Sequence, residues 1–480
     1  MKNKFFITTP IYYVNAKPHI GHAYTSVAAD ILARWNKQQD RKTFLLMGTD
    51  EHGLKIQKKA EEAEKDPQQF VDEIAEEFKS LCGKLNINYD NFIRTTDKKH
   101  KEAVQKVLQS LYDKGVIYKG TYEGLYCVGC EQFKNKSDLV DGKCPEHNIK
   151  PEIIKEESYL LKMEEIQPRL IEKIESDEFK IAPQKRKNEI LSFLENNKLK
   201  DISISRKNVS WGIPLPFDKK YTTYVWVDAF LNYLTGIGWN GSSEQFAFSG
   251  LSEMKWWPPD IQLIGKDILR VHATIWPAIL IHLGIELPKQ IFVHGHILSG
   301  GKKMSKTLGN VIGIDEMLKK FGTDGTRYLL MSAGSFGEDI DMTMERMAEK
   351  YNADLANGLG NLTSRILKLS SISNFQFLVS IQLPISDKQF SKKINQLKLD
   401  KALEYIWKVV REDNKYIEEN KPWELVKTDR KKFEKIMEKL ALDLYVISEL
   451  LIPFMPETSE KIKEALKTEK LNEVLFKRIK

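Results

Sequence analysis

Residues 5–22, FFITTPIYYVNAKPHIGH, contain the end of a predicted β-strand and the start of a predicted α-helix. KFFITTP is a short β-type run, and HIGHAYTSVAADILARW then carries apolar residues at helical spacing. TFLLMGTDEHG, from residue 43, repeats this plan with an apolar strand, a glycine, and acidic and histidine residues ahead of a helical stretch. Strands that alternate with helices in this way are typical of a parallel, doubly wound sheet, in which ligands bind at the carboxyl ends of the strands.

The bulk composition is that of a soluble globular protein. The chain has 480 residues, 41% of them hydrophobic and 29% charged, and it is long enough for two to four domains. No apolar run approaches the ~20 residues that span a bilayer, and the N-terminus is typical of a strand, not of a signal peptide. We therefore expect no membrane partner. Four cysteines are too few for a disulfide framework, which indicates a reducing cytoplasm. The net charge of +7 permits a polyanionic partner but does not require one.

The α/β pattern is interrupted once and then ends. Short strands, many lysines and three cysteines follow residue 113, and the pattern resumes at YTTYVWVDAFLNYL and QIFVHGHIL. Beyond residue 346 the 3.6-residue periodicity of the apolar residues predicts a helix bundle. The expected fold is thus a doubly wound, Rossmann-like parallel α/β sheet with an insertion, followed by an all-α C-terminal region. The predicted division is a first half of the sheet (1–112), an insertion (113–220), the second half of the sheet (221–290), a linking region (291–345) and the helix bundle (346–480).

Three of the cysteines and one histidine form a predicted metal site. Cys127 and Cys130 make a CxxC, and Cys144 and His147 follow after a gap of 13 residues as a CxxH. Each pair suits a tight turn that presents two ligands, and Cys3His is a common closed zinc site. A disulfide or unreactive thiols are the alternatives. We expect one structural Zn²⁺, because four protein ligands leave no open position for catalysis.

Two further segments together predict a phosphate site. His19 and His22 lie on one face of a first helical turn, where both can donate hydrogen bonds to phosphate, more strongly when protonated. Gly21 lets a flat base or ribose approach the backbone. Histidine pairs on helices are common, and GGKKMSKTLGN at 300–310 taken alone is typical of a solvated loop. Together they can hold a triphosphate and stabilise charge on a leaving pyrophosphate, with Lys303 and Lys306 as cations and Ser305 as a hydroxyl.

These segments resemble the sequence motifs of a known enzyme family. PHIGH matches the HIGH motif of class I aminoacyl-tRNA synthetases, and KMSKT closely matches their KMSKS motif, with Thr307 in place of the last serine. TTPIYYVNAKPHIGHAYT, GTDEHG, YVWVDAFLNYL, GKDILRVHATIWPA and NKPW resemble the methionyl-tRNA synthetase family in particular, so the resemblance spans nearly the whole chain. Two departures are a single zinc knuckle, where some relatives have two, and the lack of the C-terminal oligonucleotide-binding domain with which many bacterial members dimerise. We therefore expect a monomer.

The resemblance implies a ligase that activates methionine with ATP and Mg²⁺ and then transfers it to the terminal adenosine of tRNA(Met), both initiator and elongator. It implies that His19, Gly21, His22, Lys303, Ser305 and Lys306 are catalytic, the two histidines and two lysines binding ATP. Asp50 would hold the α-ammonium group, Ile11 would add backbone contacts, and aromatic side chains would surround the thioether, as a soft sulfur favours. The implied methionine-binding residues are Ile11, Tyr13, Asp50, Trp226, Ala229, Tyr233, Asp267 and His272.

The C-terminal third contains candidate tRNA-reading residues. Asn361 and Arg365 are at positions i and i+4 of a predicted helix, and Trp423 follows a proline at a predicted helix start. Such side chains can stack on, or hydrogen-bond to, unstacked bases. The resemblance implies that all three bind the anticodon. The alternatives are that Trp423 packs as a hydrophobic staple at the helix start and that Asn361 caps a helix.

Three other functions fit parts of the sequence. A small-molecule nucleotidylyltransferase shares the HxGH phosphate site, but it has no use for a zinc-bearing insertion or a long helix bundle. A synthetase for leucine, isoleucine or valine carries a much larger editing insertion, and one for cysteine would place a thiolate-binding metal in its amino-acid pocket. A non-catalytic zinc-containing RNA-binding module leaves the HIGH and KMSK segments unexplained. DNA is not an expected partner.

Overall fold

A seven-stranded parallel β-sheet forms the centre of the N-terminal part of the molecule. The computed structural model describes residues 3–129, 132–134, 139–145, 148–207, 209–242, 255–304, 310–373, 375, 387–471 and 473–479. The sheet has the order β2-β3-β1-β12-β13-β8, with β4 also paired to β3, and all its pairs are parallel. The strands are β1 (Lys4–Thr8), β2 (Tyr12–Tyr13), β3 (Lys42–Asp50), β4 (Asn91–Arg94), β8 (Lys180–Ala182), β12 (Ile261–Gly265) and β13 (Gln290–His294).

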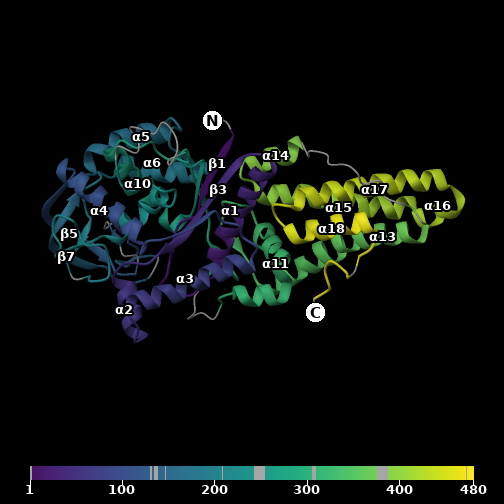
Figure 1. Ribbon diagram of the computed structural model, residues 1–480, viewed down its shortest axis with the longest axis horizontal. Helices are drawn as coiled ribbons and strands as arrows, with labels where there is room; N and C mark the ends of the chain where they lie inside the picture. Colours follow the sequence, from purple (N-terminus) through teal and green to yellow (C-terminus); the bar gives the residue numbers. More distant parts are fainter. Residues whose placement is uncertain are drawn as a thin grey trace.

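The central strand β1 shows why this sheet is covered on both faces. Successive side chains of a strand point to opposite faces, and in β1 Phe5 and Ile7 enter one hydrophobic core while Phe6 enters the other. The first core includes α1 (Ile20–Gln38) and α11 (Ile314–Ser332), and the second includes α4 (Lys98–Asp113) and α10 (Leu269–Leu283). The predicted doubly wound α/β sheet is therefore confirmed (Figure 1).

The strand order creates a crevice at one point of the sheet. The chain passes from β1 to β3 on one side of β1, and β12 later pairs with its other side. Loops that leave β1 and β12 must diverge there, which is where doubly wound sheets bind ligands. The short helices η3 (Lys266–Ile268), α7 (Val225–Phe230) and α8 (Asn232–Thr235) lie around the crevice.

The region expected as an insertion is partly shared with the main sheet. β5 (Ile117–Cys127) and β7 (Glu152–Leu161) form a long antiparallel pair, flanked by β6 (Gln132–Lys134) and β9 (Ile202–Ser203). β8, however, is the edge strand of the main sheet and pairs with β13. Residues 113–220 are thus not one separate module, and a strand of three residues is too short to show a periodic pattern in the sequence. The other elements of this region are η2 (Glu164–Ile166), α5 (Gln167–Glu175), α6 (Gln184–Asn196), β10 (Ser205–Arg206) and β11 (Thr222–Thr223).

A helix bundle forms the C-terminal part and extends away from the α/β part (Figure 1). It is connected through a small sheet, the helix α12 and the π-helix η5. All the elements described after η5 are α-helices, so the predicted bundle is confirmed. No helix in the described part of the chain is long and apolar enough to cross a membrane. The remaining elements are α2 (Leu54–Glu62), α3 (Pro67–Lys84), β14 (Ile297–Ser299), β15 (Lys302–Lys303), β16 (Ile340–Asp341), α12 (Met344–Lys350), η5 (Tyr351–Gly360), α13 (Asn361–Ser373), α14 (Lys388–Asn395), α15 (Leu399–Asn420), α16 (Pro422–Thr428), α17 (Arg430–Leu451) and α18 (Pro456–Thr468).

Candidate active site

A cavity of about 1200 Å³ opens at the carboxyl ends of the parallel strands. Its wall is formed by the segments after β1, β3, β12 and β13, by the start of α1, and by α7, α8 and α10. The sequence-predicted residues that line it are Ile11, Tyr13, His19, Gly21, His22, Asp50, Trp226, Ala229, Tyr233, Asp267 and His272. Residues from distant parts of the chain, predicted separately as phosphate-binding and methionine-binding, thus share one space.

His19 and His22 cap the helix that they begin. The backbone N–H of Gly21 donates to Nδ1 of His19 at 3.1 Å, and the backbone N–H of His19 donates to Nδ1 of His22 at 3.2 Å. The two rings are stacked, with centroids 3.7 Å apart. Because both Nδ1 atoms accept hydrogen bonds, a neutral ring must carry its proton on Nε2. Each histidine therefore keeps one N–H donor that the cap does not use.

The protonation state of this histidine pair is set by its burial. Burial lowers the pKa of His19, against a smaller opposing effect of Asp267. Burial and the neighbouring His19 lower the pKa of His22 well below its usual value. Both imidazoles are therefore neutral near pH 7. Burial disfavours a positive charge on either ring, and a charge on one ring would further disfavour a charge on the other. They donate as neutral Nε2–H groups.

Gly21 is required by the cap itself. A Cβ atom at this position would lie 2.9 Å from Cε1 and 3.1 Å from Nδ1 of the His19 ring. Any larger residue would displace the imidazole that accepts the Gly21 N–H. The glycine that was predicted to admit a base or ribose thus has a second role, which is to leave room for the histidine ring.

Aromatic side chains form another part of the cavity wall. The hydroxyl of Tyr233 lies 2.9 Å from Nε2 of His272, whose Nδ1 lies 3.0 Å from the carbonyl oxygen of Ile268. The carbonyl can only accept, so Nδ1 carries the proton and Nε2 accepts from the tyrosine. Burial lowers the pKa of His272 to about 4, which keeps the ring neutral. Trp226 and Phe230 both meet this ring edge-on, and the result is a rigid, largely uncharged pocket.

The segment expected to carry the lysines begins as a tight hairpin. Ser299 of β14 pairs with Lys302 of β15, and the two residues between them are Gly300 and Gly301, both at positive φ. Two consecutive positive φ values define the type I′ turn that joins antiparallel strands, and glycine adopts them without strain. Met304, just after β15, lines the cavity. Lys303 lies in β15, while its side chain, Ser305 and Lys306 lie outside the described residues.

His294 is a cavity residue that the sequence reasoning missed. It ends β13, is buried, and places Nε2 at 2.8 Å from the hydroxyl of Thr25 in α1 and Nδ1 at 2.8 Å from the carbonyl oxygen of Gly295. A Cβ at Gly295 would lie 2.3 Å from the backbone of Glu338, so only glycine fits there. The signal in the sequence was HGH directly after the predicted strand QIFV, at the end of a strand where ligands bind.

The structure describes two of the four predicted zinc ligands, Cys127 and Cys144. Cys127 ends β5, and both it and Cys144 are completely buried. Their neighbours Val128 and Val140 are exposed, so the two thiols are turned inward within a small surface segment. Cys130 and His147 lie outside the described residues. Within the described ranges no three histidine, cysteine or acidic side chains form a metal-binding group.

The candidate anticodon residues lie in the helix bundle, away from the cavity. Asn361 begins α13 and its Nδ2 donates to Oδ1 of Asn414 at 3.4 Å, while Arg365 pairs with Glu418 at 2.7 Å. Asn414 and Glu418 are four residues apart on α15, so one face of α15 orients both side chains. Trp423 in α16 is 41% exposed, so much of its indole is not covered by packing at the helix start.

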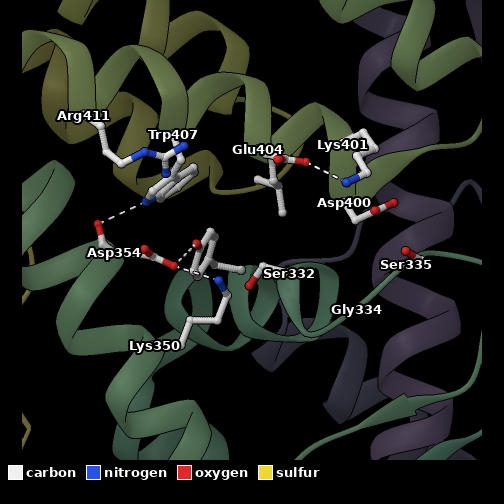
Figure 2. Close-up of a pocket in the computed structure, with 12 residues that line it drawn as sticks. Ser332, Gly334, Ser335, Lys350, Asp354, Asp400, Lys401, Glu404, Trp407 and Arg411 are labelled. Atoms are coloured by element: carbon white, nitrogen blue, oxygen red, sulfur yellow. Dashed lines mark hydrogen bonds and ion pairs between the residues drawn. The ribbon is translucent and has the colours of Figure 1, made fainter.

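A second, smaller cavity of about 310 Å³ lies between α11, η5 and α15 (Figure 2). Asp354 accepts three hydrogen bonds at this cavity. Its carboxylate accepts from the Tyr328 hydroxyl at 2.6 Å and from Lys350 at 2.8 Å, and its backbone carbonyl oxygen accepts from the Trp407 indole at 3.1 Å. The rings of Tyr328 and Trp407 stack at 4.4 Å. These polar groups satisfy one another and connect the linking region with the bundle. None of the described residues lining this cavity belongs to the predicted sites.

Two protein-family models match this chain. A model described as "tRNA synthetases class I (M)" matches residues 5–150 and 138–367. A second, described as "Anticodon binding domain of methionyl tRNA ligase", matches residues 379–475. The two models together cover both the α/β part and the helix bundle.

Whole-chain comparisons point the same way. The methionine–tRNA ligase of Clostridium acetobutylicum is 43% identical, over 98% of this chain and 74% of that protein. The methionine–tRNA ligase of Streptomyces coelicolor is 38% identical, over 97% of this chain and 90% of that protein. Among solved structures, Mycobacterium tuberculosis methionyl-tRNA synthetase in complex with methionyl-adenylate superposes with a TM-score of 0.88 at 33% identity, covering 96% of this chain and 93% of that one.

Proposed function

We propose a reaction scheme and a set of site residues for this chain, which belongs to the methionine–tRNA ligase family of class I tRNA synthetases. The enzyme activates methionine with ATP to methionyl-adenylate and pyrophosphate and then transfers the methionyl group to tRNA. The observation that carries the assignment of residues is the single cavity that the histidine pair, Asp50 and the aromatic wall all line.

Methionine binds between Asp50 and the aromatic wall. The carboxylate of Asp50 at the end of β3 holds the α-ammonium group, and the backbone around Ile11 orients the amino acid. Trp226, Tyr233 and His272 surround the thioether, because a polarisable sulfur packs favourably against aromatic edges. A neutral His272, fixed by its two hydrogen bonds, keeps charge out of the apolar part of this pocket.

Adenylate formation then requires positioning and charge stabilisation but no nucleophilic side chain. A carboxylate oxygen of methionine attacks the α-phosphorus of ATP in line, and the bond from that phosphorus to the bridging oxygen of pyrophosphate breaks. The Nε2–H groups of His19 and His22 donate to the phosphate oxygens, and Lys303, Ser305 and Lys306 stabilise the charge that builds on pyrophosphate. Mg²⁺ bound with ATP would neutralise further charge on the phosphates.

The second step uses tRNA(Met), of both the initiator and the elongator kind. A ribose hydroxyl of the terminal adenosine attacks the carbonyl carbon of methionyl-adenylate, loses its proton and displaces AMP. The anticodon binds at Asn361, Arg365 and Trp423, where the orienting contacts to α15 and the exposed indole support base readout.

The remaining assignments are proposed from the sequence. A structural Zn²⁺ fits Cys127, Cys130, Cys144 and His147, since two buried thiols in an exposed segment suit a thiolate-rich donor set. The enzyme acts as a cytoplasmic monomer. We assign residues 1–112 and 221–290 to the catalytic sheet, 291–345 to the KMSK and linking region, and 346–480 to the anticodon-binding domain. Residues 113–220 form the connective insertion, apart from β8, which is the edge strand of the catalytic sheet.

Pyrophosphate exchange into ATP without tRNA, run with each of the twenty amino acids, tests this proposal. Methionine alone should support exchange. Exchange with a different amino acid would retain the fold assignment but contradict the pocket residues. Failure of all twenty would contradict activation by the free enzyme and would favour a non-catalytic RNA-binding role.

A further inference from the structure

A buried carboxylate with two histidines lies directly behind the methionine pocket. Nδ1 of His52 donates to Oδ2 of Asp228 at 2.6 Å, and Nε2 of His100 donates to Oδ1 at 2.8 Å. All three side chains are buried. Burial alone would raise the pKa of the Asp228 carboxyl, but His52 and His100 lower it to about 2, so it is a carboxylate that accepts from both rings.

This cluster joins three segments that are far apart in the sequence. His52 lies two residues after Asp50, at the end of β3, and His100 lies in α4. Asp228 lies in α7, between Trp226 and Ala229, which both line the cavity. His100 is itself oriented by the hydroxyl of Thr235, 2.7 Å from its Nδ1.

The residues that follow β3 also have hydrogen bonds outside this cluster. The carboxylate of Glu51, the residue after Asp50, is bound by the guanidinium of Arg94 at 2.7 and 2.9 Å. The indole of Trp211 donates to the carbonyl oxygen of Glu51. Arg94 of β4 and Trp211 therefore support the position of Asp50 through Glu51. Helix α7 is connected to the same end of β3 by the hydrogen bond between Asp228 and His52.

We propose that Asp228 is a positioning residue for methionine: its carboxylate, held by His52 and His100, fixes α7 against the end of β3 and so sets the distance between Asp50 and the wall formed by Trp226 and Ala229. Asp50 binds the charged end of the amino acid and the wall binds the side-chain end, so this distance determines how closely the aromatic wall contacts the sulfur. The inference rests on the proposed function of the cavity. Neither His52 nor His100 lines the cavity in the described part of the chain, so both act through the residues that do.

A set of matched variants separates positioning from general stability. Asp228→Asn keeps the shape of the side chain but replaces one acceptor with a donor that faces an imidazole N–H. His100→Gln keeps an N–H donor near the position of Nε2, and His52→Asn keeps one near the position of Nδ1. His100→Leu and His52→Leu each remove the donor. Asp324→Asn is the control, because Asp324 is also buried but accepts from the backbone N–H of Thr458 in the bundle, remote from the cavity.

Methionine-dependent pyrophosphate exchange is measured for the full chain with methionine and with norleucine, in which a methylene replaces the sulfur. We expect Asp228→Asn, His100→Leu and His52→Leu to raise KM for methionine roughly tenfold, as loss of a charge-assisted hydrogen bond predicts, with kcat within about threefold of wild type. Preference for methionine over norleucine should fall in the same variants. His100→Gln, His52→Asn and Asp324→Asn should stay within about threefold of wild-type KM.

The outcomes distinguish this inference from the proposed function. Absence of methionine-dependent exchange in the wild-type protein would overturn the proposed function, and the inference with it. Normal wild-type exchange with an unchanged KM in Asp228→Asn would overturn the inference alone. The inference would also be overturned if His100→Gln behaved like His100→Leu, or if the variants lowered only the unfolding temperature while KM and the norleucine preference matched those of Asp324→Asn.

Discussion

Nη2 of Arg327 lies 2.7 Å from Oδ2 of Asp30, and neither side chain is exposed to solvent. Asp30 belongs to α1, the helix that begins with the histidine pair, and Arg327 belongs to α11. The same guanidinium donates to the carbonyl oxygens of Leu85, Pro453 and Phe454. One buried arginine therefore joins the catalytic helix to the turn between α17 and α18 in the helix bundle.

Replacement of this arginine should be severely destabilising. In Arg327→Met the Asp30 carboxylate keeps Arg34 but loses its buried partner, and three carbonyl groups lose a donor. Removal of one partner of a buried ion pair typically costs about 3–5 kcal/mol. Urea unfolding should show this decrease in the free energy of unfolding. Arg346→Met is the control: Arg346 pairs with Asp341 on the surface and should change stability little. Equal effects of the two substitutions would contradict a structural role for Arg327.

The buried histidines should make the fold sensitive to acid. The pKa of His272 is lowered from 6.5 to about 4 by burial, so between these pH values the unfolded chain binds a proton that the folded chain does not. The free energy of unfolding therefore falls as the pH falls from 6.5 towards 4, by about 3 kcal/mol for this residue. The pKa values of His19, His22 and His294 are also lowered, with the same sign.

Unfolding curves recorded from pH 7 to pH 4 check this dependence. His272→Gln should lower stability at pH 7 but flatten the decrease towards pH 4, because glutamine does not titrate. An unchanged slope in His272→Gln would show that His272 is not the titrating group.

The two lysines of the KMSK segment should act on the leaving group. Lys303→Ala and Lys306→Ala should slow adenylate formation far more than they weaken methionine binding. Pyrophosphate gains charge in the transition state, whereas the proposed methionine contacts are made by Asp50 and the aromatic wall. Single-turnover adenylate formation and equilibrium binding of methionine measure the two effects. Equal losses in both would contradict this role.

Trp423 should matter for tRNA and not for methionine. Its exposed indole in α16 is remote from the residues that line the catalytic cavity. Trp423→Ala should raise KM for tRNA by roughly 10-fold or more, since stacking of one base on an aromatic ring contributes ~1–3 kcal/mol. Methionine-dependent pyrophosphate exchange should stay unchanged, and Trp423→Phe should retain much of the affinity for tRNA. A loss of exchange in Trp423→Ala would indicate a packing role.

Much of the fold was predictable because its signals are local. The strand β1 is a continuous apolar run, α1 has helical periodicity, and α15 and α17 have amphipathic patterns that extend over many turns. β8 was missed because three residues carry no period, and its pairing with β13 joins segments more than a hundred residues apart. Local pattern gives no information about such a pairing.

The candidate site was likewise predictable only in part. The sequence by itself predicted a phosphate site from its histidine and lysine motifs, and its resemblance to a known family predicted the methionine-binding residues. Only the tertiary structure decided that His19 and His22 are neutral donors, since their protonation depends on burial. Only the tertiary structure brought Asp228 between His52 and His100 and Arg327 against Asp30. The charge state of a side chain and its partners depend on which distant segments exclude water around it, and a linear pattern does not contain that information.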